Sequence, residues 1–416
     1  MKECLGEEKP RKKNSKKSKV EVSYDSSMFL LLFSKVSRII LLNPHPLMMR
    51  VLSTLLISSG VVYSDKVPSQ IHLALGPTPD SMGVQWSSDS ADSTVKYRKA
   101  NSENDWSLVH GKTFPFMDGG EEKYNQTHHV ARMVELEPST PYEYKVGSSA
   151  DGWSEKFTFS ATPTTDSAKY PIRFGVWGDM GSKDNGAAIL NEVTDVVDNG
   201  HSFDMILHVG DFAYNMDNNN GKLGDDFMND IQHIATQIPY MVCVGNHEVA
   251  YDFSHYTERF RVVGDSFAPA SYPTVHSGNG EGFNNWFYSH DFANVHFVAI
   301  STEIYFDYAD TDLLAAQWNF VKDDLEKVDR KKTPWVVVHG HRPCYCSCDD
   351  DCDDAAALVR DGVEGQFGLE VSEGIRIESI RFDDEMYTCP TTTTKTYIIF
   401  LTFKFLFHRD RVGTPS

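Results

Sequence analysis

The sequence is short of positive charge. Its 416 residues include 39 Lys and Arg against 59 Asp and Glu, which gives a formal net charge of −20. Residues 1–20 hold eight basic side chains against three Glu, a local net charge of +5 that leaves −25 for the rest of the chain. A protein that binds nucleic acid generally needs a basic surface to neutralise phosphates, so this acidic body argues against a nucleic-acid partner.

Long apolar runs are also missing. Charged residues and Pro interrupt residues 28–64, so no stretch reaches the roughly 18 apolar residues of a membrane-spanning helix, and no stable membrane span is expected. The segment from Met49, with one Arg, a short apolar run over residues 51–57 and small residues up to Ser64, is typical of a secretory signal peptide. We therefore expect residues 1–64 to be a basic leader with a signal peptide that starts at Met49, and the mature protein to be secreted, lysosomal or extracellular. A basic disordered or nuclear-type leader is the alternative.

Cysteine is scarce, with seven residues, and four of them lie within residues 344–352. A disulfide such as Cys346 to Cys352 and a thiolate metal site both explain this cluster. Because no second cluster or His pair follows at zinc-finger spacing, the disulfide is favoured. The glycosylation acceptor sequence at Asn125 also fits secretion. Cys243 lies in an apolar run and is expected to be a buried core thiol.

Residues 66–163 are predicted to form a β-sandwich. Apolar and polar residues alternate in short runs between turn residues, a period of two that is typical of antiparallel strands with one buried face. The alternating apolar residues are Ile71, Leu73, Leu75, Met82, Val84, Trp86, Val95, Tyr97, Phe157 and Phe159. Residues 136–146, which include Tyr142 and Tyr144, resemble the tyrosine corner of fibronectin type III domains. A sandwich serves as scaffold or binding module, so it leaves the function open.

An α/β body is predicted over residues 171–370, after a polar linker. Four short apolar runs each end in a polar cluster, as sheet strands buried on both faces do. These runs are residues 172–177, 205–209, 240–244 and 335–338. In open α/β sheets, ligands bind beyond the carboxyl ends of the strands. We therefore expect one pocket to collect Asp179, Asp211, Tyr214, Asn246, His247 and His341.

Each of these residues alone has an ordinary explanation. Asp or Asn after Gly is a common turn pair, and a His at a strand end is more often a structural residue than a ligand. Four polar clusters at four successive strand ends are harder to explain in this way. Carboxylates, an amide, imidazole and a phenolate together suit two hard or borderline cations that share a bridging carboxylate.

With these clusters, residues 66–370 resemble the purple acid phosphatases, which belong to the calcineurin-like metallophosphoesterases. The likeness lies in Gly-Asp at 178–179, Gly-Asp-Phe-Ala-Tyr at 210–214, Gly-Asn-His-Glu at 245–248 and His-Gly-His-Arg-Pro at 339–343. Tyr214 narrows the resemblance to the purple group. The chain looks most like the long animal- and plant-type members, and this likeness implies an N-terminal all-β fibronectin type III-like sandwich followed by an α/β metallophosphoesterase domain of two packed sheets flanked by helices. Its activity is the hydrolysis of phosphate monoesters.

The resemblance also implies a role for each matching residue. Asp179 and Tyr214 would bind a ferric ion, and Asp211 would bridge the two metals. Asn246 and His341 would bind a divalent ion, which is Zn, Fe or Mn. In such a centre a hydroxide bound to the metals attacks the phosphorus of the ester.

Further residues around the centre are assigned by the same resemblance. His247 would bind phosphate or protonate the leaving alcohol. Three other residues are candidates to support the ligands from behind: His339, Glu248 and Arg342. The expected substrates are small phosphomonoesters, and a homodimer is among the assemblies that the sequence leaves open.

The sequence departs from the family at its C-terminal end. The family completes its site with a His-x-His pair that gives one imidazole to each metal, whereas this chain has only His408 after His341. Residues 371–416 form an atypical tail, and residues 397–407 within it are typical of an aggregation-prone β segment. We therefore expect the metallophosphoesterase domain to be C-terminally incomplete. A catalytically inactive truncated metallophosphatase, or a secreted binding protein that uses its fibronectin-like domain, are the alternatives to an acid phosphatase.

Overall fold

The computed structural model describes residues 66–182, 190–191, 193–194, 203–263, 284–306, 311–342 and 399–403. The predicted signal peptide, the candidate disulfide between Cys346 and Cys352, and His408 all lie outside the described residues. Both predicted folded parts, the sandwich and most of the α/β body, lie within them.

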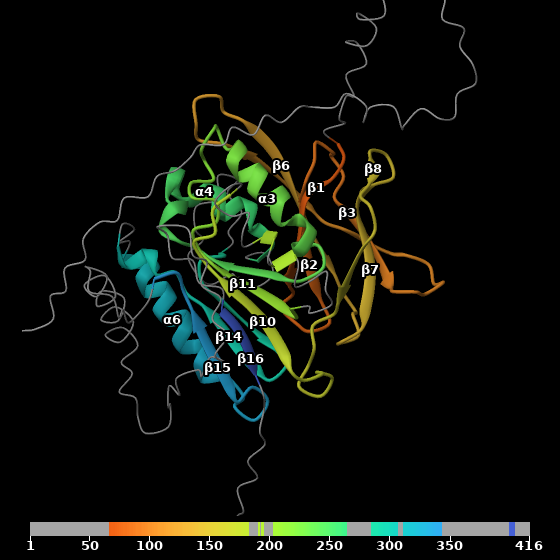
Figure 1. The fold of residues 1–416 in the computed structure, drawn as a ribbon, viewed down its shortest axis with the longest axis vertical. Helices are drawn as coiled ribbons and strands as arrows, with labels where there is room; N and C mark the ends of the chain where they lie inside the picture. Colours follow the sequence, from red (N-terminus) through yellow and green to blue (C-terminus); the bar gives the residue numbers. More distant parts are fainter. Residues whose placement is uncertain are drawn as a thin grey trace, which may run out of the picture. The chain divides into compact units, whose positions relative to one another are not determined.

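Two antiparallel sheets form the N-terminal part of the described chain (Figure 1). One sheet has the strand order β1-β2-β6-β5, and the other has the order β4-β3-β7-β8 with β9 also paired to β7. The strands are β1 (Ser69–Leu75), β2 (Met82–Ser87), β3 (Thr94–Lys99), β4 (Ser107–His110), β5 (Lys112–Met117), β6 (Asn125–Met133), β7 (Pro141–Ser148), β8 (Gly152–Trp153) and β9 (Phe157–Ser160). Trp86 and Tyr97 from the alternating runs are buried, and so is Tyr144 from residues 136–146. The predicted β-sandwich is thus confirmed.

Two further sheets form the α/β body as far as the structure describes it. The first has the order β12-β11-β10-β16, in which β10, β11 and β12 are parallel, and the second has the order β13-β14-β15. Their strands are β10 (Ile172–Trp177), β11 (Met205–Val209), β12 (Tyr240–Cys243), β13 (Tyr288–Phe292), β14 (Val295–Ala299), β15 (Trp335–His339) and β16 (Ile399–Phe403). The ring of Phe174 on β10 meets those of Phe292 and Phe297 edge-on, with centroids 5.6 and 5.1 Å apart. These contacts pack the two sheets together, as predicted.

In the described part of the chain, three longer helices accompany the sheets: α3 (Lys222–Ala235), α4 (Ala250–Arg259) and α6 (Thr311–Lys327). Helix α3 buries Phe227, Ile231 and Ile234 on one face, as expected for an amphipathic helix that covers a sheet. It also contacts the sandwich, because Gln232 Oε1 accepts a hydrogen bond from the Ile71 N–H at 2.9 Å. Within the described residues, no helix is both long and apolar enough to cross a membrane.

Strand β15 departs from the prediction that all four runs are buried on both faces. Trp335 and Val338 are 44% and 49% exposed, because β15 is an edge strand of its sheet as far as the structure describes it. Cys243 is fully buried and free, as predicted. Part of the predicted β segment in the tail forms β16, whose backbone pairs antiparallel with β10.

Candidate metal centre

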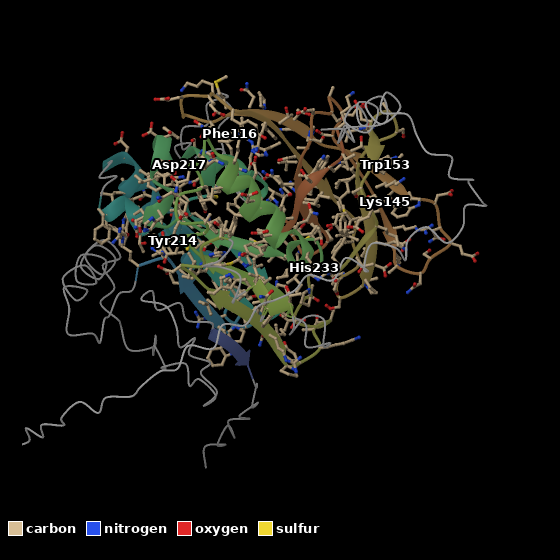
Figure 2. The ribbon with its side chains drawn as sticks, turned by 45° about the horizontal axis from the view of Figure 1, so that its top comes forward. Phe116, Lys145, Trp153, Tyr214, Asp217 and His233 are labelled. Carbon is tan, nitrogen blue, oxygen red and sulfur yellow. The ribbon has the colours of Figure 1, made fainter. Side chains whose placement is uncertain are left out.

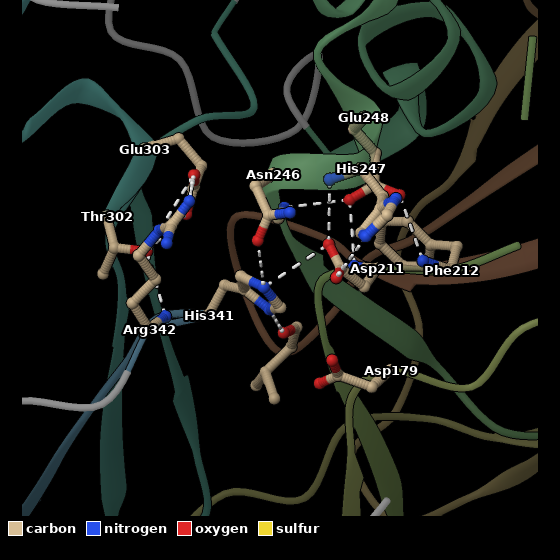
Figure 3. A network of polar contacts seen from close by, with 12 residues as sticks. Asp179, Asp211, Phe212, Asn246, His247, Glu248, Thr302, Glu303, His341 and Arg342 are labelled. Carbon is tan, nitrogen blue, oxygen red and sulfur yellow. Dashed lines mark hydrogen bonds and ion pairs between the residues drawn. The ribbon is translucent and has the colours of Figure 1, made fainter. Parts of the chain in front are cut away.

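The six predicted pocket residues follow the carboxyl ends of β10, β11, β12 and β15. Figure 3 shows five of them close together: Asp179, Asp211, Asn246, His247 and His341. One ligand atom each from Asp179, Asp211 and His341 lies within 4.8 Å of the other two. Tyr214 Oη donates a hydrogen bond to Asp179 Oδ1 at 3.1 Å. Asn246 Oδ1 lies 3.1 Å from His341 Nε2 on the other side. Residues from four separate strand ends therefore form one cluster.

Two glycines allow the strand ends to approach this closely. A Cβ on Gly245 would lie 2.4 Å from Asp211 Oδ1, and a Cβ on Gly210 would lie 2.7 Å from His341 Nδ1. Gly210 also has a φ of +84°, which side-chain-bearing residues rarely adopt. Any larger residue at either position would push the cluster apart.

The loops of the cluster hold several residues in the left-handed backbone region. Asp179 and Asp211 both have φ of 54°, and Tyr214 has φ of 49°. Non-glycine residues adopt this region rarely and at an energetic cost, and such positions gather at functional sites. The strain is consistent with loops that are shaped to present side chains rather than to minimise their own energy.

The cluster brings the carboxylates of Asp179 and Asp211 together, and that of Asp211 is buried. Asp211 is only 2% exposed, and burial raises the pKa of its carboxyl group. Burial and the nearby Asp179 carboxylate raise the pKa of Tyr214. In the described part of the chain only His247 and His341 lie within ion-pair distance of Asp211, and no Lys or Arg does. A buried carboxylate such as Asp211, which no Lys or Arg of the described residues neutralises, fits a bound cation when other oxygen ligands lie beside it.

His341 is held in place from behind. Its Nδ1 lies 2.8 Å from the Val209 carbonyl oxygen, so Nδ1 carries a proton and Nε2 faces Asp211 Oδ1 at 3.4 Å. Burial alone would lower the pKa of His341, but the Asp211 charge and the carbonyl contact raise it. A carbonyl contact of this kind fixes the tautomer that a metal-binding imidazole needs.

Glu248 stabilises the loops of the cluster. Its Oε2 accepts the N–H groups of Asp211 and Gly245, both at 2.9 Å, and its Oε1 accepts the N–H of Phe212 at 3.0 Å. Burial and the Asp211 charge raise the pKa of Glu248 to about 7. The side chain therefore ties the loop after β11 to the loop after β12.

Arg342 and His339 lie further from the convergent ligands. The guanidinium of Arg342 makes a bidentate ion pair with Glu303, in which Nη2 lies 2.8 Å from Oε2. The backbone N–H of Arg342 donates a hydrogen bond to Thr302 Oγ1 at 3.1 Å. His339 is the last residue of β15, so strand alternation does not extend to His341. Neither ring nitrogen of His339 has a hydrogen-bond partner in the described part of the chain, and burial lowers its pKa to about 4.

Asn215 is a site residue that the sequence patterns did not single out. Its Oδ1 lies 2.9 Å from His247 Nδ1, and the ring of Tyr214 meets the His247 ring edge-on at a centroid distance of 4.7 Å. Asn215 directly follows the cluster after β11, so its position at the strand end was the available signal. The two neighbours orient His247, whose side chain is 37% exposed.

The chain also matches two known protein families. Residues 68–161 match the family described as "Purple acid Phosphatase, N-terminal domain", and residues 172–371 match "Calcineurin-like phosphoesterase". A mouse (Mus musculus) protein named "Acid phosphatase type 7" is 37% identical over 315 residues, which cover 74% of this chain and 67% of the mouse protein. This chain belongs to the purple acid phosphatase family.

Two other members of the family illustrate the likeness. The human (Homo sapiens) protein "Acid phosphatase type 7" is 36% identical over 327 residues, which cover 76% of this chain and 69% of the human protein. The structure of purple acid phosphatase PPD1 from yellow lupin (Lupinus luteus) seeds superposes with a TM-score of 0.53 at 24% identity, over 68% of this chain and 52% of the lupin chain. At that identity the lupin structure supports the fold alone. The chain spans about two thirds of the length of its mouse and human relatives.

Proposed function

We propose that this purple acid phosphatase hydrolyses phosphate monoesters at a centre of two metal ions. The observation that carries the proposal is the convergence of Asp179, Asp211 and His341 within 4.8 Å. Tyr214 and Asn246 border this cluster on its two sides and add a phenolate and an amide oxygen. The donor set suits a ferric ion beside a divalent ion such as Zn, Fe or Mn, with Asp211 between them.

In this proposal each ligand has a place in the cluster. Asp179 and Tyr214, which share a hydrogen bond of 3.1 Å, would hold the ferric ion. Asn246 and His341 would hold the divalent ion, and Asp211 lies within reach of both groups. Two bound cations would supply Lewis acidity at the phosphoryl oxygens and an acidified water at low pH.

His247 is proposed to contact the substrate. With Asn215 Oδ1 as acceptor, Nδ1 of His247 carries a proton, so Nε2, which lies 3.8 Å from Asp211 Oδ2, is the nitrogen that would act on a phosphate group or a leaving oxygen. A protonated imidazole could donate its Nε2–H to the leaving alcohol, which would otherwise depart as an unstable alkoxide. The backbone N–H of His247 also donates to Asp211 Oδ1 at 3.0 Å, which ties its position to that of the bridging carboxylate.

The absent His-x-His pair makes metal content the sharpest test. We would express residues 65–416 through a secretory pathway, measure metals per chain by elemental analysis, and assay turnover of p-nitrophenyl phosphate at acidic pH. About two metals per chain, one of them iron, together with turnover would support the proposal. Little bound metal and no turnover would overturn it and favour the catalytically inactive alternative.

Secretion is part of the same proposal. The predicted signal peptide at residues 49–64 would route the chain to the secretory pathway, and Asn125, exposed at the start of β6, would be glycosylated there. A mass decrease after treatment with an N-glycosidase, absent in Asn125→Gln, is the expected result. A protein that stays in the cytoplasm without glycan would contradict it.

A further inference from the structure

A side chain of the sandwich, Asp118, is buried against the α/β body. It directly follows β5 and has no exposed surface. Its Oδ1 lies 2.8 Å from Nε2 of His255 on α4, and its Oδ2 accepts the Gly120 N–H at 2.7 Å. The ring of Phe116 on β5 meets the His255 ring edge-on, with centroids 5.0 Å apart. A buried carboxylate is costly unless its partners satisfy it, so this contact has to be made with defined geometry.

The direction of the hydrogen bonds at His255 follows from its other neighbour. Arg259 Nε can only donate, and it donates to His255 Nδ1 at 3.3 Å. Nδ1 is therefore the acceptor, and Nε2 carries the proton that is donated to Asp118. Burial and the Arg259 charge lower the pKa of His255 to about 4, which is consistent with a neutral ring.

Arg259 extends the network to a loop beside the metal centre. Its guanidinium donates to the Gly221 carbonyl oxygen at 2.9 Å and to Asp225 Oδ1 at 2.7 Å. Gly221 closes residues 215–221, the loop that begins with Asn215, the partner of His247. Figure 2 labels Phe116 on β5 and Asp217 in this loop. The network thus joins the sandwich to the loop that orients His247.

The start of α4 makes a second connection. Tyr251, Asp252 and Phe253 have φ between 52° and 58°, three successive residues in the left-handed region, shortly after His247 and Glu248. The Tyr251 ring lies against Gly119 of the sandwich, where a Cβ would be 2.2 Å from Tyr251 Cγ. The turn between β5 and β6 therefore packs on two segments near His247, the loop of residues 215–221 and the start of α4.

We infer that Asp118 is a positioning residue: through His255 and Arg259 it fixes the loop of residues 215–221 and the start of α4, and thereby the orientation of His247. The inference rests on the proposed function and adds a role in catalysis for the sandwich, which otherwise serves as scaffold. In the described part of the chain, the side chain of Asp118 bonds to Gly120 and His255 and to none of the proposed metal ligands. Asp118 therefore affects the reaction only indirectly, because His255 and Arg259 transmit its effect to the orientation of His247.

Four variants of the full chain test this role. Asp118→Ala and His255→Leu break the network, and each should lower kcat for p-nitrophenyl phosphate about tenfold, while KM stays within about twofold and the metal content does not change. His255→Gln keeps one donor for Asp118 and one acceptor for Arg259, so it should retain most of kcat. Tyr144→Phe is the matched control, because Tyr144 Oη makes another buried bond between sandwich and body, to the Thr236 carbonyl oxygen at 2.9 Å. It should retain the kcat of the unmodified chain.

A second readout does not depend on turnover. In protein loaded with zinc alone, the ¹⁵N resonance of His247 Nδ1, assigned with His247→Gln, reports its hydrogen bond to Asn215. It should shift in Asp118→Ala and stay in place in Tyr144→Phe. If the unmodified chain shows no turnover, the proposed function fails, and this resonance alone decides the inference.

Three results would overturn the inference. The first is an Asp118→Ala protein that folds and keeps both kcat and the His247 resonance. The second is an equal loss of kcat in Tyr144→Phe, which would mean that any loosening of the domain contact acts in the same way. The third applies if Asp118→Ala does not fold. Equal kcat values for His255→Leu and His255→Gln would then show that the hydrogen-bond network through His255 does not affect kcat.

Discussion

His247 Nδ1 lies 2.9 Å from Asn215 Oδ1, and this contact joins two loops that leave different strands of one sheet. Asn215 belongs to the loop after β11, and His247 to the turn after β12. The imidazole is exposed enough to meet a substrate, yet one of its nitrogens is already committed to the amide. Its position is therefore set by the fold before any substrate binds, which is the preorganisation that the proposed proton transfer would require.

Replacing Asn215 with Ala should reduce catalysis without removing the metals. The substitution frees the His247 ring to rotate, so we expect kcat for p-nitrophenyl phosphate to fall about tenfold with unchanged metal content, the size typical of a lost orienting partner. Asn229→Ala, at an exposed position on α3, serves as the control and should leave kcat unchanged. A fully active Asn215→Ala protein would show that the contact does not orient a catalytic group.

Asp211 should be the residue on which metal binding depends most. Its buried carboxylate lies within reach of ligand atoms from both sides of the cluster, so Asp211→Asn removes the negative charge that two cations would share. We expect metal content to fall below one per chain and turnover to drop by about three orders of magnitude or more. Elemental analysis and the phosphatase assay measure both effects. Asp105→Asn, which replaces an exposed carboxylate of the sandwich, is the control and should change neither. Two metals per chain in Asp211→Asn would contradict the proposed bridging role.

Much of the fold could be predicted from local sequence patterns. Alternation at Ile71, Leu73 and Leu75 and the runs that became β10, β11 and β12 depend on near neighbours in the chain, so periodicity detects them. The expectation that Asp179 and His341 would meet required one more rule, that ligands gather beyond the carboxyl ends of parallel strands. With that rule, residues that follow four different strands were predicted to lie together, and Asp179, Asp211 and His341 do so.

Contacts between distant residues could not be foreseen in the same way. Asp118 and His255 are separated by 137 residues, and neither lies in a recognisable motif, so their hydrogen bond follows only from the packing of the sandwich on α4. The exposure of Trp335 and Val338 also depends on which strands pair with β15, and an apolar run alone does not specify its neighbours.

Glu248 should contribute to both stability and metal affinity. Its two carboxylate oxygens accept three backbone N–H groups, and in Glu248→Gln one of these oxygens becomes an NH₂ group that faces a donor. A buried donor without an acceptor costs about 1–3 kcal/mol, so the free energy of unfolding should fall by that amount. Because the same N–H groups shape the loops that carry Asp211 and Asn246, metal affinity should fall about 10- to 100-fold. Urea denaturation and competition with a chelator measure the two effects, and a variant equal to the unmodified chain in both would exclude this role.

His296 gives the protein a pH-dependent contribution to stability that does not involve the metal centre. Its Nδ1 lies 2.6 Å from Asp291 Oδ1 and its Nε2 lies 2.7 Å from Asp324 Oδ2. Burial alone would lower the pKa of His296, but the hydrogen bonds and charges of the two carboxylates raise it from 6.5 to about 9. The folded state therefore binds a proton more tightly than the unfolded state, and this contribution is complete below about pH 6.5 and is lost as the pH rises to about 9.

The size of this contribution follows from the shift and from solvent screening. A rise from 6.5 to about 9 sets an upper limit of about 3 kcal/mol, and since the Asp291 side chain is 56% exposed we expect about 1–2 kcal/mol. Urea unfolding at pH 6 and pH 9 measures it as the difference between the unmodified chain and His296→Gln, whose side chain does not titrate. The destabilisation caused by His296→Gln should be larger at pH 6 than at pH 9 by that amount. An equal destabilisation at both pH values would mean that His296 is not protonated between its two carboxylates. Because the contribution is greatest in acid, the pair of carboxylates around His296 would stabilise the fold in the same pH range in which an acid phosphatase works.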